Sequence, residues 1–229
     1  LYDVGNSAFT MMVSTLIPIY FNSLAEADGL SSTNYLAYWG YSISISTLIV
    51  MITGPVLGTI SDNRGYKKPI FLASVIIGVA SCLFLGLPGN WLMFLVLFVL
   101  ARTAYDASLV FYDSMLIDVT TEERMDRVSS YGYALGYIGS CIPFIASLVL
   151  VLKAGSLGLS SKKAMIIAFG ITGLWWLITT VPLLKTYEQV NYQEKVDHPF
   201  SESFRHLGKT IRQAKHEKKV FIFLLAFFF

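Results

Sequence analysis

The chain has 229 residues, of which 55% are hydrophobic and 14% are charged, and its formal net charge is +2 at pH 7. Soluble domains carry about 25% charged residues, so this composition argues against a soluble protein. A nucleic-acid binder would show a basic face or stripe, which the near-neutral balance does not favour, and we expect no nucleic-acid partner.

Apolar segments long enough to cross a bilayer follow one another along the chain. A membrane helix needs about 20 mainly apolar residues. Six segments meet this length: 3–24, 36–60, 69–87, 91–117, 129–152 and 164–184. A seventh begins at Val220. The sequence therefore predicts an all-α membrane protein, with a six-helix bundle over 1–185, a linker over 186–219 and the start of a second bundle over 220–229. We expect the chain to be a piece of a longer protein.

The connections between these segments alternate in their basic residues. Those at 22–35, 88–90 and 153–163 carry few Lys or Arg residues. The basic residues of the others are Arg64, Lys67, Lys68, Arg124, Arg127 and those between Lys185 and Lys219. Because Lys and Arg gather on the cytoplasmic side, we expect the N-terminus and the 61–68, 118–128 and 185–219 loops in the cytoplasm. We also expect the protein to lie in a bacterial plasma membrane.

The long linker is polar at first and then becomes amphipathic. Its apolar residues fall at helical spacing on one face: Phe200, Phe204, Leu207, Ile211 and Ala214. Basic residues surround this face. The pattern predicts a helix on the inner membrane surface or under the bundle, or a solvated linker helix.

The segment 91–117 carries charges near its middle. Arg102 and Asp106 are four residues apart, within pairing distance on a helix, and Asp113 continues the same face. A charge at the bilayer centre costs roughly 2.5–3.5 kcal/mol on insertion scales, so such residues are expected to face the bundle interior or a water-filled cavity. The structural alternatives are that Arg102 and Asp106 only hold helices together, and that Asp113 sits at the membrane interface.

The first segment has a polar face of its own. Its members recur at helical spacing: Asp3, Asn6, Ser7, Thr10 and Ser14. A helix rises about 1.5 Å per residue, so the depth of each residue in the membrane can be counted along the chain. This count places the polar face of the first segment at the same depths as the charged face of 91–117. We therefore predict that both faces line one cavity. Hydrogen bonding between helices is the alternative for Asn6, Ser7 and Ser14.

The fifth segment contains small residues at close spacing. Gly132, Gly136 and Gly139 predict the close approach of another helix, and Pro143 is expected to kink or loosen the segment. A hinge or an ion-leak seal is the alternative reading of this region.

The loop after the second segment carries the most specific short motif. Its pattern is G-x-x-x-D-x-x-G-x-[RK]-[RK], formed by Gly58, Asp62, Gly65, Lys67 and Lys68, with Arg64 just before Gly65. This pattern resembles the loop signature of the major facilitator superfamily. Six helices and a long basic loop before a seventh agree with half of that fold.

A closer resemblance covers essentially the whole chain. The stretches Tyr2–Phe9, Pro18–Phe21, Phe111–Leu116 and Arg127–Gly139 are similar to the vacuole-effluxer-like branch of that superfamily. The branch leads us to expect an amide where Asp113 stands and a proline at Ile117 or its neighbour. Two interpretations of Asp113 follow: an added titratable group, or a local variation.

The resemblance implies a secondary transporter of twelve or more helices, with this chain as its N-terminal bundle. It implies that the first and fourth helices line the central cavity, that the fifth flanks it, and that the third and sixth lie outside. It also implies a gating role for the loop, in which Asp62 and Arg64 hold the cytoplasmic side shut against the C-terminal bundle.

We therefore predict proton-coupled transport of a small polar solute, such as an amino acid or a related metabolite. Asp106 is the first candidate proton carrier and Asp3 is the second. Arg102 is expected to be the counter-charge of Asp106 or to bind a substrate carboxylate. Two alternatives stay open: an enzyme resembling intramembrane aspartyl proteases, which needs two carboxylates sharing a proton, and a membrane receptor on the same fold. The sequence has no Gly-rich phosphate loop, and we expect no cofactor and no metal site.

Overall fold

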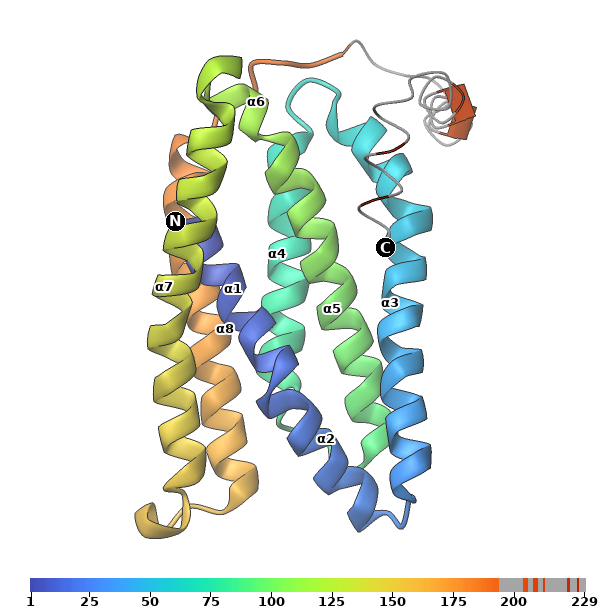
Figure 1. The fold of residues 1–229 in the computed structure, drawn as a ribbon, viewed down its shortest axis with the longest axis vertical. Coiled ribbons are helices and arrows are strands. Elements are labelled where there is room, and N and C mark those ends of the chain that lie inside the picture. The colour runs from blue at the N-terminus through green and yellow to red at the C-terminus, as the bar shows by residue number, and fades with distance from the viewer. Residues whose placement is uncertain (194–203, 206–207, 210–211, 213–221, 223–225, 227–229) are drawn as a thin grey trace.

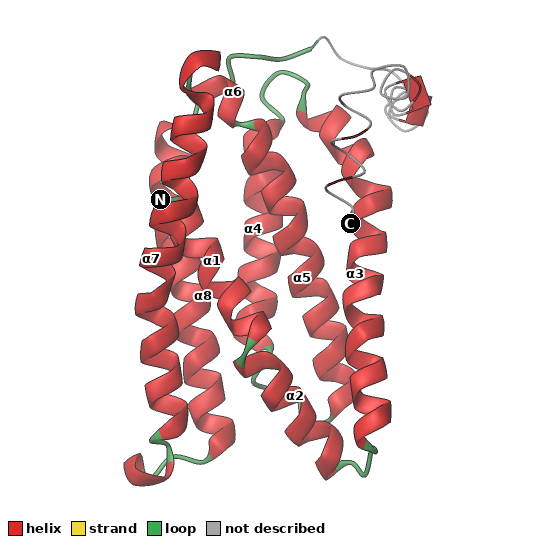
Figure 2. Cartoon of the chain, in the orientation of Figure 1, coloured by secondary structure: helices red, strands yellow, loops and turns green. Residues whose placement is uncertain are grey.

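The computed structural model describes residues 1–193, 204–205, 208–209, 212, 222 and 226, and its continuous part is built of helices joined by short connections (Figure 2). Along the chain these are α1 Tyr2–Ser14, α2 Leu16–Ala27, α3 Ser32–Ser61, α4 Lys67–Phe84, α5 Trp91–Ser114, α6 Leu116–Val119, α7 Met125–Leu152 and α8 Ser161–Thr186, with 3-10 turns at Glu122–Arg124 and Gly155–Leu157. They form 6 helical spans that are long and apolar enough to cross a membrane. The predicted all-α membrane fold is therefore confirmed.

The spans stand side by side in one bundle (Figure 1). The helix α1 packs against α7 and α8, α4 packs against α5 and α8, and α3 packs against α5. The connections 62–66 and 120–124 and the segment 187–193 lie at one end of the bundle, at the top of Figure 1. We call this the loop-motif end.

The first span is two helices and not the single helix predicted over 3–24. The chain breaks at Thr15, whose backbone angles are φ −138° and ψ −85°. Pro18 has no N–H to donate to the carbonyl of Ser14, and its ring disfavours a continuous helix through this point. Two hydroxyls bond the carbonyls just before the break, from Ser14 to Thr10 and from Thr15 to Met11. The hydropathy pattern alone does not predict such a break, because the flanking residues are all suited to a membrane helix.

The other spans begin and end within a few residues of the apolar segments. Three begin at a polar cap that lies outside the apolar run: Ser31 accepts from the Asn34 N–H, Asn90 from Met93 and Ser160 from Lys163. Such caps satisfy amide groups that have no partner inside the helix. The fourth span continues past Ser114 as the short α6. Helix α7 runs unbroken through Pro143.

The bundle core is aromatic and lies where α1, α5 and α8 meet. Trp176 of α8 is fully buried, and its ring lies 5.7 Å from Phe9 and 5.8 Å from Tyr105. Aromatic pairs at such distances add to the stability gained from burial. This core fixes the position of α1 relative to α5.

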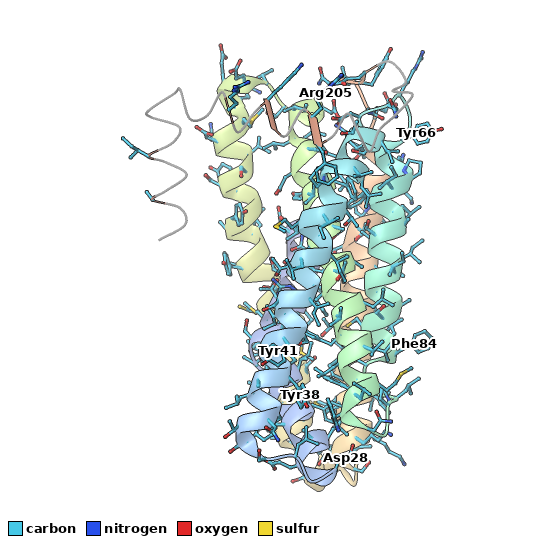
Figure 3. The ribbon with its side chains drawn as sticks, turned by 90° about the vertical axis from the view of Figure 1, so that its right-hand side faces the viewer. Asp28, Tyr38, Tyr41, Tyr66, Phe84 and Arg205 are labelled. Carbon is cyan, nitrogen blue, oxygen red and sulfur yellow. The ribbon has the colours of Figure 1, made fainter. Side chains whose placement is uncertain are left out.

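The helix α3 lies on the outside of the described bundle. Its buried residues are Ser42, Ser46 and Ser61, whereas Tyr38 and Tyr41 lie on its outer face (Figure 3). An apolar helix with so little buried surface is suited to contact with lipid or with further helices.

Two predicted features of the chain beyond the bundle lie mainly outside the described residues. These are the amphipathic helix over 200–214 and the further span from Val220. The bundle itself ends with α8 at Thr186, next to the predicted boundary at 185.

Candidate functional site

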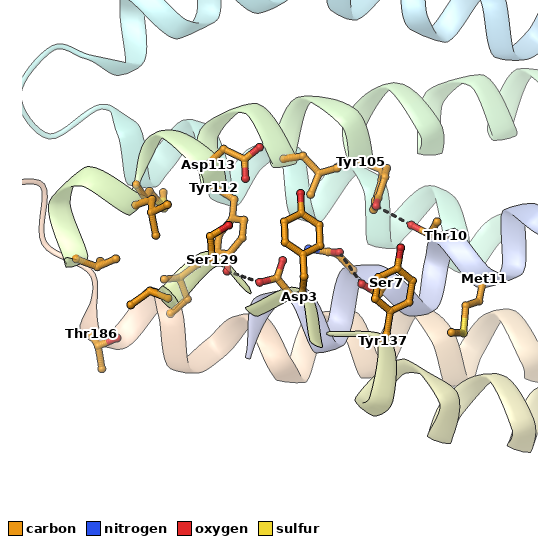
Figure 4. Close-up of a pocket in the computed structure, with 18 residues that line it drawn as sticks. Asp3, Ser7, Thr10, Met11, Tyr105, Tyr112, Asp113, Ser129, Tyr137 and Thr186 are labelled. Atoms are coloured by element: carbon orange, nitrogen blue, oxygen red, sulfur yellow. Dashed lines mark hydrogen bonds between the residues drawn. The ribbon is translucent and has the colours of Figure 1, made fainter. Parts of the chain in front are cut away.

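A cavity of about 420 Å³ lies between α1, α5 and α7, and its lining extends to Val119 and Thr186 at the loop-motif end (Figure 4). Its size lies within the range of about 300–1,000 Å³ that small-molecule sites occupy. The lining residues with polar side chains are Asp3, Asn6, Ser7, Thr10, Tyr105, Tyr112, Asp113, Ser129, Tyr133, Tyr137 and Thr186. The two polar faces found in the sequence therefore meet at one cavity.

Asp3 is held in place from two sides. The hydroxyl of Tyr112 donates to its Oδ2 at 2.6 Å (Figure 4). On the other side, α7 approaches through glycines: a Cβ on Gly132 would lie 2.5 Å from Asp3 Oδ2, and one on Gly136 would lie 3.0 Å from Asp3 Cβ. The small residues of the fifth segment thus let α7 pack directly against the acidic end of α1.

Gly139 continues the same contact, because a Cβ there would lie 2.5 Å from a methyl of Val4. Gly5 makes the matching approach on the other side of α1, where an added Cβ would collide with the hydroxyl of Thr179 on α8. Helix α1 is therefore enclosed by α7 and α8 at close range.

Hydroxyl pairs tie α1 to α5 beside the cavity. Thr10 and Tyr105 share a hydrogen bond of 2.6 Å, and Tyr2 and Ser108 share another of 2.6 Å in the core. Asn6, which is 3% exposed, has an amide nitrogen without a hydrogen-bond partner in the described part of the chain. Buried polar groups normally find a partner, so this amide is a feature that the fold alone does not explain.

The second cavity carboxylate, Asp113, differs from Asp3 in its surroundings. Its side chain is exposed to the cavity, and no hydrogen bond or ion pair joins it to another residue of the described chain. Among the residues that line the cavity none is Lys, Arg or His.

Arg102 and Asp106 form an ion pair, as their spacing predicts, with 2.9 Å between Arg102 Nε and Asp106 Oδ2. Their side chains are 26% and 20% exposed, and neither lines the cavity. The Arg102 guanidinium lies 5.6 Å from the ring centre of Tyr105, which does line it. The side chain of Tyr105 thus lies between the ion pair and the cavity. Asp106 is bound by Arg102, whereas Asp3 is bound by Tyr112.

A buried ionic cluster at the loop-motif end centres on Asp118 of α6. The side chain of Asp118 is 0% exposed and that of Lys67 is 1% exposed, with 3.4 Å between Lys67 Nζ and Asp118 Oδ2. The same Nζ lies 3.8 Å from Asp62 and 3.3 Å from the carbonyl of Ser114. The loop motif therefore joins α3, α4 and the end of the fourth span.

Asp118 also holds the chain that leaves the last helix. It accepts from the Tyr187 hydroxyl at 2.6 Å, and from the Asn191 backbone N–H and side-chain amide at 2.7 and 2.9 Å. Hydrogen bonds to a charged acceptor are among the stronger ones in proteins. Burial and the neighbouring Asp118 carboxylate raise the pKa of Tyr187 above its ordinary value.

The segment 187–193 lies against the loop motif itself. Gln189 accepts from the N–H of Gly65, which has φ +81°, and Gln193 donates its N–H to the Asp62 carbonyl at 2.8 Å. The Arg64 guanidinium lies 5.2 Å from the Tyr192 ring centre. Partial burial raises the pKa of Asp62, while the nearby Lys67 opposes that shift.

Two residues of the loop motif and the two cysteines do not line the cavity. Gly58 faces open space and lends its carbonyl to the turn at Asp62, and Lys68 donates to the Tyr187 carbonyl. Cys82 and Cys141 are both free thiols. No group of three or more His, Cys, Asp or Glu residues that could hold a metal occurs among the residues described.

The chain matches the family described as "Vacuole effluxer Atg22 like" over residues 1–120 and 117–229. It is 41% identical to the uncharacterized MFS-type transporter YxiO of Bacillus subtilis, over 100% of this chain and 55% of that protein. An uncharacterized protein of Aquifex aeolicus is 26% identical over 86% of this chain and 46% of its own length. Autophagy-related protein 22 of Coccidioides immitis is 25% identical over 85% of this chain and 42% of its own length. The chain thus spans about half the length of the curated relatives it matches, and no solved structure matches it significantly.

Proposed function

Because the chain belongs to the vacuole effluxer Atg22-like family of the major facilitator superfamily, we propose that the full-length protein is a proton-coupled secondary transporter of a small polar solute. This chain supplies its N-terminal six-span bundle. The transporter named among its relatives supports the activity in general. The observation that carries the proposal is the polar cavity between α1, α5 and α7.

The cavity has the properties that a transport site needs. Its walls combine apolar side chains with hydroxyls, an amide and two carboxylates, and it lies between spans that are otherwise apolar. In transporters of this general design, substrate and coupling-ion sites lie between bundles that rock against each other. A C-terminal bundle packed across the cavity would close its remaining side, and the exposed α3 and α7 have apolar surface available for such packing. The density of Lys and Arg residues supports a cytoplasmic position for the loop-motif end.

The ion pair of Arg102 and Asp106 is our candidate for the proton-coupling element. Protonation of Asp106 removes the charge that holds Arg102, whose guanidinium in the paired state already lies 5.6 Å from the ring centre of Tyr105 on the cavity wall. A proton taken up at Asp106 is in this way linked to the position of a wall residue. Asp3 remains the second candidate carrier.

Replacing Asp106 with asparagine is expected to reduce solute-driven proton flux by about tenfold or more, because the amide keeps the shape of the carboxylate but cannot exchange a proton. The measurement uses full-length protein in proteoliposomes that contain a pH-sensitive dye, to which amino acids, organic amines or sugars are added. Arg102→Ala is expected to lower the flux as well, whereas Asp126→Asn, an exposed carboxylate outside the cavity, should leave it unchanged. Unaltered flux in both pair variants would remove the pair from the mechanism.

The loop-motif cluster is proposed as the element that holds one end of the bundle in a single state. Lys67, Asp62 and Asp118 join the ends of three spans and the segment that leads to the second bundle. Alternating access requires these contacts to differ between states. We therefore expect Asp62→Asn to impair turnover more than solute binding. The measurement compares the initial transport rate of the variant with its equilibrium solute binding.

A further inference from the structure

The charge balance of the cavity is uneven. It is lined by two carboxylates, Asp3 and Asp113, and by four tyrosines, but by no basic side chain. Two basic side chains of the neighbouring bundle are engaged elsewhere: Arg102 pairs with Asp106, and Lys67 pairs with Asp118 and Asp62. A carboxylate in a poorly solvated site is unfavourable unless a positive charge or hydrogen bonds compensate it.

We propose that this cavity recognises an ammonium group, so that the solute is a small organic cation or carries an ammonium at the end that enters this bundle. The inference rests on the proposed transport function and specifies its substrate class. The positive charge that the walls lack is supplied by the solute.

Asp3 is built to receive such a group. Its Oδ2 accepts from Tyr112, and no described residue donates to its Oδ1. An ionised carboxylate can accept several hydrogen bonds through its two oxygens. Because Tyr112 and the α7 glycines restrict the carboxylate, it is already oriented before the solute arrives, which reduces the ordering that binding requires.

The tyrosines supply the second part of ammonium recognition. Tyr105 and Tyr112 of α5 and Tyr133 and Tyr137 of α7 line the cavity, and Figure 4 shows Tyr105, Tyr112 and Tyr137 around it. Aromatic faces attract cations through their quadrupole, and cages of such rings are a known means of binding quaternary ammonium groups. Tyr133 and Tyr137 are 63% and 64% exposed, so their rings are accessible.

Asn6 indicates what else the solute carries. It lines the cavity and is almost fully buried, and its amide nitrogen has no partner among the described residues. The nitrogen is buried and unpartnered, so a hydroxyl or carbonyl oxygen of a solute that reaches Asn6 would satisfy it. The structure thus favours a compact solute that combines an ammonium group with an oxygen acceptor.

The test measures binding to detergent-solubilised full-length protein by isothermal titration calorimetry. The probes are choline and ethanolamine as cations, 3,3-dimethyl-1-butanol as the neutral isostere of choline, and butyrate as an anion. We expect at least one of the two cations to bind, and neither the neutral nor the anionic probe. Asp3→Asn should weaken cation binding about tenfold or more, because the charge-assisted contact is lost.

Asp113→Asn is the second variant, since its carboxylate has no described partner and its replacement should not disturb folding; it too should weaken cation binding. Asp126→Asn is the matched control and should bind as the wild type does. Equal binding of choline and its neutral isostere, preferential binding of butyrate, or no binding of any probe would overturn the ammonium site. Cation binding without any solute-driven proton flux would instead overturn the transport proposal and leave the site standing. Proton flux driven only by anionic or neutral solutes would overturn the ammonium site and leave the transport proposal standing.

Discussion

Replacing Asp118 with alanine is expected to lower the free energy of unfolding by about 3–5 kcal/mol, because it leaves the buried ammonium of Lys67 without its closest anionic partner. The side chains of Lys67 and Asp118 are 1% and 0% exposed, so water cannot compensate the lost charge in the folded state. The remaining carboxylate, Asp62, lies 3.8 Å away and is 43% exposed, which makes it a weaker substitute. The change also removes the acceptor for Tyr187 and Asn191.

The measurement is SDS-induced unfolding of the full-length protein in mixed micelles. The double variant Lys67→Met with Asp118→Leu should be less destabilised than Asp118→Ala alone, because it removes both charges together. Asp126→Ala, on an exposed carboxylate, should change the unfolding free energy by no more than about 0.5 kcal/mol. A loss for Asp118→Ala as small as that of this control would show that the cluster does not stabilise the fold.

Replacing Gly136 with leucine is expected to destabilise the bundle by about 1–3 kcal/mol or more, because the contact between α1 and α7 has no room for a side chain. A Cβ at this position would lie 3.0 Å from Asp3 Cβ and 3.2 Å from the Asp3 carbonyl oxygen. The carbonyl belongs to the backbone of α1, so it cannot turn aside as a side chain can. The same change would displace Asp3, and we expect it to reduce solute binding as well.

The control for this variant is Gly40→Leu on α3, where an added Cβ meets nothing within 4 Å. Replacing glycine in a helix favours the helix by up to about 1 kcal/mol, so the control reports this gain without the clash. Thermal unfolding followed by fluorescence-detected size exclusion separates the two variants. Equal stability of Gly136→Leu and Gly40→Leu would contradict the close packing of α1 on α7.

The spans and part of the cavity follow from the sequence because they rest on local pattern. Apolar run length locates helices, and helical spacing places Asp3, Asn6 and Thr10 on one face. The face of α5 is partly as predicted, since Asp113 lines the cavity, but Arg102 and Asp106 neutralise each other outside it. Spacing along a helix identifies a face, but it does not say how far along that face a cavity extends.

The remaining features depend on contacts between distant parts of the chain. Asp118 stands at the end of an apolar segment, and its partners Lys67, Tyr187 and Asn191 come from other elements. Nothing near Asp118 in the sequence indicates that its side chain is buried. Tyr133 and Tyr137 were missed as cavity residues for a related reason, because tyrosines on a membrane helix are also common at the bilayer interface.

The return of 187–193 onto the loop motif was also beyond sequence reasoning. Gln189 and Gln193 bind mainly backbone groups of the 61–65 loop, and backbone partners leave no signature in the side-chain pattern. A periodic pattern can predict the helices on either side of this segment, but not where a short polar connection will lie.

The most direct test of the central claim is uptake of a radiolabelled solute by full-length protein in proteoliposomes, with a pH gradient imposed in each direction in turn. The solute is the one that gives the strongest proton flux in the dye assay. The account predicts accumulation with one orientation of the gradient, its loss when a protonophore dissipates that gradient, and a reduction of about tenfold or more in Asp106→Asn. Uptake that is the same with and without a gradient, and the same in wild type and Asp106→Asn, would contradict proton-coupled transport.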